Sequence, residues 1–217
     1  MNDVHPLAGV LDAAARGRFP AVDGAVEVLA PDAAGTRAVV AFTGHAFVLA
    51  DVDPDDVATH GADGFGGAHA PRFVAWLAGP NASIGSLDVV LVAPGRGRRP
   101  CGIERCHDLD DHPRVARALA HRRDVQVWGD DGGLIVLGRG LVGRCELSAE
   151  LLDDTTADPG HGRRLIDAGR DLVPAGEWCW AQVAAGNARS LRAFLAAGFV
   201  PVGSEILIEN GGRVASF

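Results

Sequence analysis

The chain has 217 residues, of which 47% are hydrophobic and 22% are charged, and its net charge is −8. This length fits one large domain or two small lobes, and the apolar fraction excludes a chain that is disordered throughout. The acidic balance argues against a nucleic-acid-binding protein, because phosphate contacts need a basic surface. All 20 basic residues are arginines, and the absence of tyrosine removes one kind of acid catalyst.

No stretch of the sequence is suited to a membrane or to export. The longest apolar runs, such as Asp88–Ala93 and Leu134–Leu137, are far too short to cross a bilayer. The first residues, Met1–Pro6, lack the basic region and apolar stretch of a secretory signal. We therefore expect a cytoplasmic protein that does not bind a membrane.

We expect the four cysteines to be reduced thiols in this compartment. Cys101 and Cys106 precede His107 and His112 in a loop rich in glycine, proline and arginine, and these four side chains are candidate metal ligands. Structural zinc sites place their second ligand pair at a distance along the chain. We therefore expect a solvated loop here and no metal.

Hydrophobic alternation, helical spacing and turn residues predict the elements of the N-terminal half. Helices are expected over Leu7–Arg16 and Arg72–Ala78, with a helical turn at Pro54–His60. The predicted strands are Ala25–Leu29, Arg37–Phe42, His45–Val52 and the buried core strand Leu87–Val92. The segment Gly61–Ala70 contains four glycines and is expected to be a loop.

The C-terminal half follows Pro94–Pro100, which is typical of a linker. Its predicted helices run from Asp111 or His112 to about Arg122, over Gly160–Val173 and over Asn187–Ala197. Its predicted strands are Val125–Trp128, Leu134–Leu137, Cys145–Leu152, Trp178–Ala184 and Phe199–Ile208. This order predicts an α/β fold whose sheet mixes antiparallel and parallel pairs.

Two glycine motifs are candidates for phosphate binding. Gly138–Gly143 has the dinucleotide spacing G-x-G-x-x-G, but a strand-like segment follows it instead of a helix, so we interpret it as a turn. Gly160-His161-Gly162 follows a strand and begins an amphipathic helix. Its glycines permit a close backbone approach, and the N–H groups of the first helical turn point at a bound diphosphate.

The segment after the second motif forms another strand, helix and strand. Asn187 starts this helix, Ser190 follows one turn later, and Gly198-Phe199 ends it. This order and spacing resemble the second half of the GNAT superfamily of acyl-CoA-dependent N-acyltransferases, over roughly His112–Ile208. The resemblance implies a GNAT-like fold, with a mixed twisted sheet flanked by helices and an N-terminal α/β accessory lobe.

The resemblance also implies where coenzyme A would bind. The end of the strand Cys145–Leu152, at Leu151-Leu152, would hydrogen-bond the pantetheine and polarise the thioester carbonyl. The pantetheine would fill a gap between this strand and Trp178–Ala184. The residues implied for the pyrophosphate are Gly160, His161, Gly162, Arg163 and Arg164. Those implied for the coenzyme arm are Asn187 and Ser190.

Catalytic roles follow from the same resemblance. Glu146 corresponds to the general base of many members, and Glu150 lies on the same strand face as the substitute. Phe194 stands where many members carry the tyrosine that protonates the departing thiolate. Ser190 is the candidate acid instead, either directly or through a water, unless the thiolate leaves unassisted.

Two departures in the phosphate loop keep a further alternative open. Ala157 stands where the superfamily pattern has arginine or glutamine, and Asp158 brings a negative charge near the diphosphate. With Phe194, these residues suit a chain that binds a CoA ester without turning it over.

The sequence therefore predicts an accessory lobe over residues 1–93, a loop or linker over 94–111, and an acetyl-CoA-binding core over 112–217. The implied function is an N-acetyltransferase that moves an acetyl group from acetyl-CoA to a primary amine of a small molecule or peptide. Transfer would occur by direct attack in a ternary complex, without a metal. The alternatives are a non-catalytic acyl-CoA-binding or regulatory module, and an interaction domain that binds no coenzyme. The acceptor and the oligomeric state stay open, a homodimer included.

Overall fold

The computed structural model describes residues 4–152 and 160–209, which form two compact units. Within these residues, the first unit comprises 4–89 together with 202–209, and the second comprises 90–152 and 160–201. This division differs from the predicted domain boundaries at two points. Residues 90–111, predicted as the end of the accessory lobe and the linker, are part of the second unit, and most of the last strand belongs to the first.

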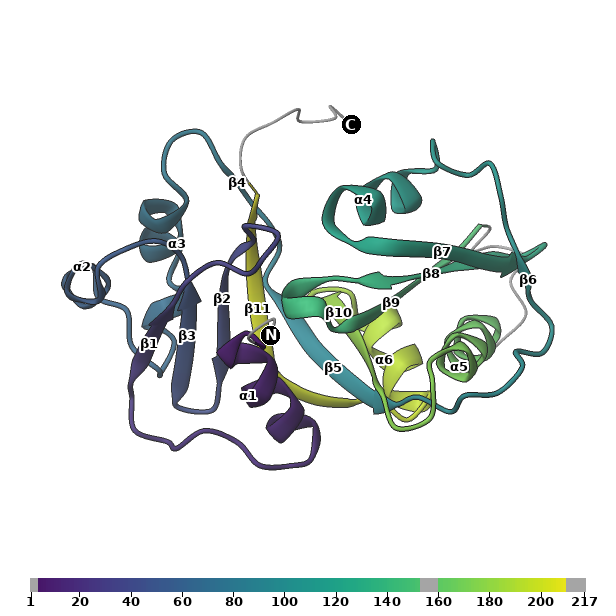
Figure 1. Cartoon of the computed structure of the whole chain (residues 1–217), viewed down its shortest axis with the longest axis horizontal. Helices are drawn as coiled ribbons and strands as arrows, with labels where there is room; N and C mark the ends of the chain where they lie inside the picture. The colour runs from purple at the N-terminus through teal and green to yellow at the C-terminus, as the bar shows by residue number, and fades with distance from the viewer. Residues whose placement is uncertain (1–3, 153–159, 210–217) are drawn as a thin grey trace. The chain divides into compact units, whose positions relative to one another are not determined.

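The first unit contains a mixed sheet and three helices (Figure 1). Its strands are β1 (Val26–Leu29), β2 (Arg37–Phe42), β3 (His45–Leu49), β4 (Ser83–Ile84) and β11 (Val200–Glu209). They are ordered β1-β3-β2-β11, and β4 pairs with β11. The β1–β3 pair is parallel, whereas β2 is antiparallel to both β3 and β11. The helices are α1 (Pro6–Ala15), α2 (Pro54–Thr59) and α3 (Pro71–Ala78).

Each of these helices begins with a proline at its first position. The fixed φ of proline suits a helix start, and its missing N–H would have no helical partner there. From α3, Phe73 and Leu77 then pack against Val39 of β2 and Val48 of β3, which forms the core of the unit. The predicted loop between α2 and α3 contains a short 3-10 turn at Gly67–His69.

The second unit has a longer mixed sheet (Figure 1). Its strands are β5 (Asp88–Pro94), β6 (Glu104–Arg105), β7 (Arg123–Asp130), β8 (Gly133–Arg139), β9 (Cys145–Leu151) and β10 (Trp178–Ala184). Their order is β5-β10-β9-β8-β7-β6. The pairs from β6 to β9 are antiparallel, and β9 and β10 are parallel. The helices are α4 (Pro113–His121), α5 (His161–Leu172) and α6 (Ala188–Ala196).

Alternation along the strands assigns α4 and α5 to opposite faces of this sheet, as Figure 1 also shows. Gly169 of α5 lies against one face, where an added Cβ would come within 2.7 Å of Leu147 and 3.0 Å of Ile135. Val115 of α4 packs with Val136 on the other face. Because Val136 is the cross-strand partner of Ser148, that second face also carries Ser148 and the other even-numbered residues of β9.

The predicted α/β class and the predicted order of long elements are confirmed. The strand expected at Leu87–Val92 is β5, with its residues from Val90 to Ala93 buried. The G-x-G-x-x-G segment is a turn between antiparallel strands, as predicted, with a 3-10 turn at Leu141–Gly143. Strands β4 and β6 were not predicted, because two residues are too few to show alternation. All four cysteines are free thiols, as expected.

Replacing Gly169 by valine is expected to lower the free energy of unfolding by about 1–3 kcal/mol, because the new side chain overpacks the contact with Leu147. Gly9→Val is the matched control, since Gly9 is an exposed helical glycine with nothing within 4 Å of an added Cβ. The control should change stability by less than about 0.5 kcal/mol. Urea denaturation measures both. Equal stability losses would mean that Gly169 is not a close-packing position.

Candidate functional site

Strands β9 and β10 separate soon after they meet. Strand β8 pairs with β9 along all seven residues, from Arg139 opposite Cys145 to Gly133 opposite Leu151. The parallel β9–β10 register contains two partners in the described residues, at Cys145 and Glu146 of β9. Beyond Glu146, β9 therefore stays paired with β8 and diverges from β10. This is the gap that the superfamily resemblance implied for a pantetheine.

At the end of β9, some backbone N–H and C=O groups face strand β8 and others face this gap. The N–H of Leu152 donates to the carbonyl of Gly132 at 3.0 Å. In an antiparallel ladder this bond makes Leu151 and Gly133 a non-hydrogen-bonded pair. The N–H and C=O of Leu151 consequently point away from β8, toward the gap. Of the two residues predicted to contact the pantetheine, Leu151 has the required orientation, whereas the Leu152 amide is already engaged.

Helix α5 begins next to this strand end. Gly160 precedes the helix with φ +89°, a left-handed conformation that glycine adopts without strain. The N–H of Arg164 donates to the Gly160 carbonyl at 3.0 Å and closes the first turn. An added Cβ on Gly162 would meet only Leu151, at 3.9 Å. The predicted phosphate loop and the gap are therefore adjacent. The departures at Ala157 and Asp158 lie outside the described residues.

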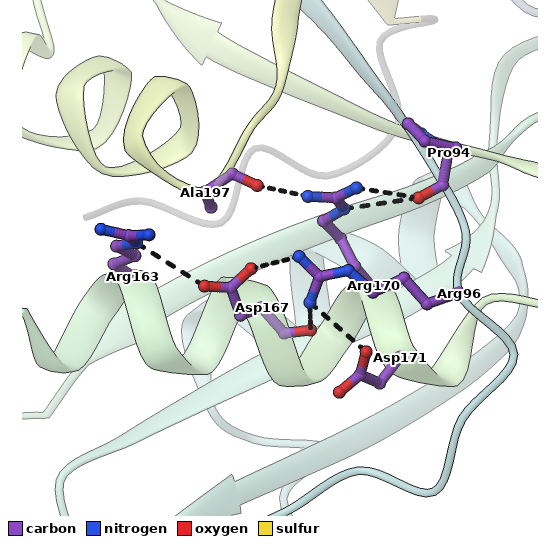
Figure 2. Close-up of polar contacts among 7 residues, drawn as sticks. All are labelled: Pro94, Arg96, Arg163, Asp167, Arg170, Asp171 and Ala197. Atoms are coloured by element: carbon purple, nitrogen blue, oxygen red, sulfur yellow. Dashed lines mark hydrogen bonds and ion pairs between the residues drawn. The ribbon is translucent and has the colours of Figure 1, made fainter.

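The three charged side chains of the loop take different positions. His161 Nε2 lies 3.0 Å from Asp130 Oδ1, so this ring ties the helix start to the β7–β8 turn. Arg163 points along the helix toward Asp167, with its Nε 3.7 Å from the carboxylate (Figure 2). Arg164 Nη1 would lie 3.6 Å from a Cβ at Gly160. Arg164 is thus the side chain beside the helix start, whereas the side chains of His161 and Arg163 each have an acidic partner.

Glu146 is buried in a clamp of two arginines. Its Oε1 accepts a hydrogen bond from Arg144 Nε at 2.7 Å, and its Oε2 accepts one from Arg122 Nε at 2.8 Å. The N–H of Leu141 also donates to Oε1, at 3.2 Å. A Cβ at Gly140 would fall 2.2 Å from the carboxyl carbon, so a side chain there would force this carboxylate to move. The middle glycine of G-x-G-x-x-G therefore makes room for this carboxylate.

This environment keeps Glu146 ionised. Burial alone would raise the pKa of its carboxyl, but the charges of Arg144 and Arg122, with the hydrogen bonds from Arg144 and Leu141, lower the pKa below its ordinary value. A general base at neutral pH works best with a pKa near the operating pH. The arrangement therefore opposes the predicted base role and favours a structural one. The spacing argument identified the position and missed Arg122 and Arg144.

The remaining catalytic candidates have the following neighbours. Glu150 is half-exposed and accepts from Arg114 Nε at 2.5 Å. Asn187 Oδ1 accepts from the N–H of Ser190 at 3.1 Å, so the asparagine side chain caps α6. Ser190 is half-buried in the first turn of that helix. Phe194 is buried edge-on against Phe199, with ring centroids 5.0 Å apart, and belongs to the core.

A buried arginine holds α5 in place. Arg170 donates to the Pro94 carbonyl at 3.1 Å and to the Ala197 carbonyl, which links α5 to the end of β5 and the end of α6 (Figure 2). Burial lowers the pKa of its guanidinium. On the helix surface, Arg96 pairs with Asp167 at 2.7 Å. Sequence reasoning missed Arg170, although it lies one turn after Ile166 on the apolar face of α5.

No match was found in a scan against protein-family models or among curated proteins. Solved structures that match include a GNAT-family protein from Novosphingobium aromaticivorans (18% identity, 62% of this chain, 69% of that chain, TM-score 0.44). A second is a conserved protein of unknown function from Staphylococcus epidermidis (12% identity, 60% of this chain, 64% of that chain, TM-score 0.39). A third is a GCN5-related N-acetyltransferase from Kribbella flavida (14% identity, 61% of this chain, 61% of that chain, TM-score 0.37). The chain spans less than two thirds of the last two. Similarities at this level do not assign a family, so the function proposed below depends on the geometry of the second unit.

Three further observations concern membrane-spanning helices, metal-binding groups and cavities. Every helix in residues 4–152 and 160–209 is too short or too polar to span a membrane. In the same residues, His, Cys, Asp and Glu side chains form no group of three that could hold a metal. A cavity of about 160 Å³ is lined by Cys106, His107 and Val115, among others, and none of its lining residues belongs to β9, β10 or α5.

Glu146→Gln is expected to lower the free energy of unfolding at pH 7 by about 3–5 kcal/mol, because it leaves buried guanidinium charge without its carboxylate. Glu150→Gln, on the same face of β9, should cost less than about 1 kcal/mol because its ion pair is half-exposed.

The folded-state pKa of Glu146 is lowered, so its contribution is complete above its unfolded pKa of about 4.3 and is lost as pH falls through the folded value. The stability difference between wild type and Glu146→Gln should therefore shrink in acid. Urea denaturation from pH 7 to pH 3 measures this trend. A stability difference that is independent of pH, or equal losses of stability in Glu146→Gln and Glu150→Gln, would contradict a buried ion pair between Glu146 and the two arginines.

Proposed function

We propose that this protein is an N-acetyltransferase whose second unit binds acetyl-CoA and transfers the acetyl group to a primary amine. The observation that carries the proposal is the divergence of β9 from β10 directly beside the glycine-rich start of α5. A thioester with a long polar arm and a diphosphate needs both features: an open strand edge for the pantetheine, and unpaired helix N–H groups for the phosphates. The resemblance of Gly160–Gly162 and Asn187–Gly198 to the GNAT pattern supports the same ligand.

In this proposal the diphosphate lies against the first turn of α5, where Gly160 and Gly162 permit close approach and Arg164 adds positive charge. The pantetheine extends along β9 and bonds the backbone of Leu151. The acceptor amine attacks the thioester carbon, the C–N bond forms, and the C–S bond breaks as the thiolate leaves. Backbone N–H groups stabilise the oxyanion. Glu150 or solvent takes the amine proton, and Ser190 is the candidate donor to the thiolate.

A second function is favoured by one specific observation. Glu146 is held ionised between two arginines, and the acid position is occupied by the core residue Phe194. A protein that binds a CoA ester without turning it over needs neither a base nor an acid. Assay of thiol release with a panel of primary amines separates the two functions. Binding of acetyl-CoA without thiol release by any amine would favour the binding module.

Gly162→Glu is expected to weaken acetyl-CoA binding at least tenfold, because the new carboxylate would stand at the helix start where the diphosphate is proposed to lie. Gly9→Glu introduces the same residue on α1, where nothing lies within 4 Å of an added Cβ, and should leave the affinity unchanged. Calorimetric titration measures both dissociation constants. If Gly162→Glu binds as tightly as the control, the assigned phosphate site is wrong.

A further inference from the structure

A group of polar side chains closes one face of the gap between β9 and β10. We define the arginine cluster as Arg122, Ser148 and Gln182, together with the Glu146–Arg144 pair that supports it. Ser148 and Gln182 lie two residues beyond the last paired residues, Glu146 on β9 and Trp180 on β10, and on the same side of the sheet. Arg122, at the end of α4, donates to both of them. The cluster therefore bridges the gap at its narrow end.

The guanidinium of Arg122 is only partly used. Its Nε makes a short bond of 2.8 Å to Glu146. Its two terminal nitrogens reach neutral oxygens over longer distances, 3.2 Å to Ser148 Oγ and 3.5 Å to Gln182 Oε1. Paired terminal nitrogens are the part of arginine that binds a carboxylate in a bidentate manner, with much shorter bonds. The two terminal nitrogens of Arg122 therefore form only long hydrogen bonds to neutral oxygens.

A second donor beside it has no acceptor. Gln182 Nε2 is buried and has no hydrogen-bond partner among the described residues. Turning the amide over would place its NH2 group against Arg122, donor against donor, so the orientation with Oε1 toward Arg122 is the one that the contact supports. A buried donor left unpaired is unfavourable, because it has lost its hydrogen bonds to water. An additional acceptor oxygen at this position would give it a partner.

From this geometry we infer that the arginine cluster binds a carboxylate of the substrate, with Arg122 and Gln182 as the specificity-determining residues. This inference rests on the proposed function and adds the substrate class. A carboxylate supplies two acceptor oxygens, which suit the terminal nitrogens of Arg122 and the free donor of Gln182. It belongs either to the acyl group, as in a dicarboxylic acyl-CoA, or to the amine acceptor, as in an amino acid. Either source is brought toward the narrow end of the gap when the pantetheine extends along β9 from the start of α5, as in the proposed function.

Binding measurements on matched ligand pairs test the inference without requiring turnover. For the acyl source, the dissociation constants of succinyl-CoA and butyryl-CoA are compared by calorimetry, because these acyl groups differ only by a carboxylate in place of a methyl group. For the acceptor source, β-alanine and propylamine are compared on the protein loaded with CoA, because these amines differ only by a carboxylate in place of a methyl group. We expect at least a tenfold preference for the carboxylate ligand in one of the two pairs. That pair identifies the source.

Two variants then locate the preference. Arg122→Lys keeps a positive charge but removes the paired nitrogens, and Gln182→Glu places a fixed carboxylate beside Arg122 without removing the arginine. Each should reduce the preference to less than threefold. Arg114→Lys is the control, since Arg114 lies on the same helix and pairs with Glu150 outside the cluster. It should retain the full preference.

The outcomes are distinguishable. Equal affinities within both ligand pairs, or a preference that survives both cluster variants, would overturn the inference and leave the proposed acetyl-CoA site standing. Failure of both CoA esters, and of acetyl-CoA, to bind would overturn the proposed function, and the inference with it. Loss of preference in Gln182→Glu, with retention in Arg114→Lys, would support the inference even if Arg122→Lys proved unstable.

Discussion

Strand β9 depends on one neighbour for most of its length. Its pairing with β8 is continuous, whereas its parallel pairing with β10 covers only its first two residues. Backbone N–H and C=O groups need partners when they are taken out of water. The gap edge of β9, ending at Leu151, therefore offers a ready set of donors and acceptors to an extended ligand. The start of α5 beside it offers donors of the kind that bind phosphate.

Arginines link the elements that surround this gap. Arg170 fixes α5 to the ends of β5 and α6 through their carbonyls, and the pair Arg96–Asp167 supports the same helix from its surface. On the opposite face of the sheet, Arg122 and Arg144 enclose Glu146. Arginine suits these buried roles because it stays charged and presents several donors in a fixed plane. These arginines place several hydrogen-bond donors at the narrow end of the gap.

The sequence predicted the parts of this structure that depend on local order. Gly160 marked a helix start, and the strand-like residues after Gly143 excluded a dinucleotide site. Spacing also located Glu146 correctly on β9. It did not reveal that Arg122 approaches Glu146 from another element, because such a contact depends on α4 packing over the sheet. The lowered pKa of Glu146, which opposes the predicted base role, arises from these tertiary contacts. The engagement of Leu152 by Gly132 likewise depended on the β8–β9 register, which the sequence did not define to the residue.

Hydrogen exchange resolved for individual amides by NMR, with and without saturating acetyl-CoA, tests the central claim most directly. The amides of Leu151 and of residues 161–163 should exchange more slowly when the ligand is bound. That of Leu152 should not change, because it already donates to Gly132. Bound acetyl-CoA that leaves Leu151 and the first turn of α5 unprotected would contradict a coenzyme site between β9 and β10.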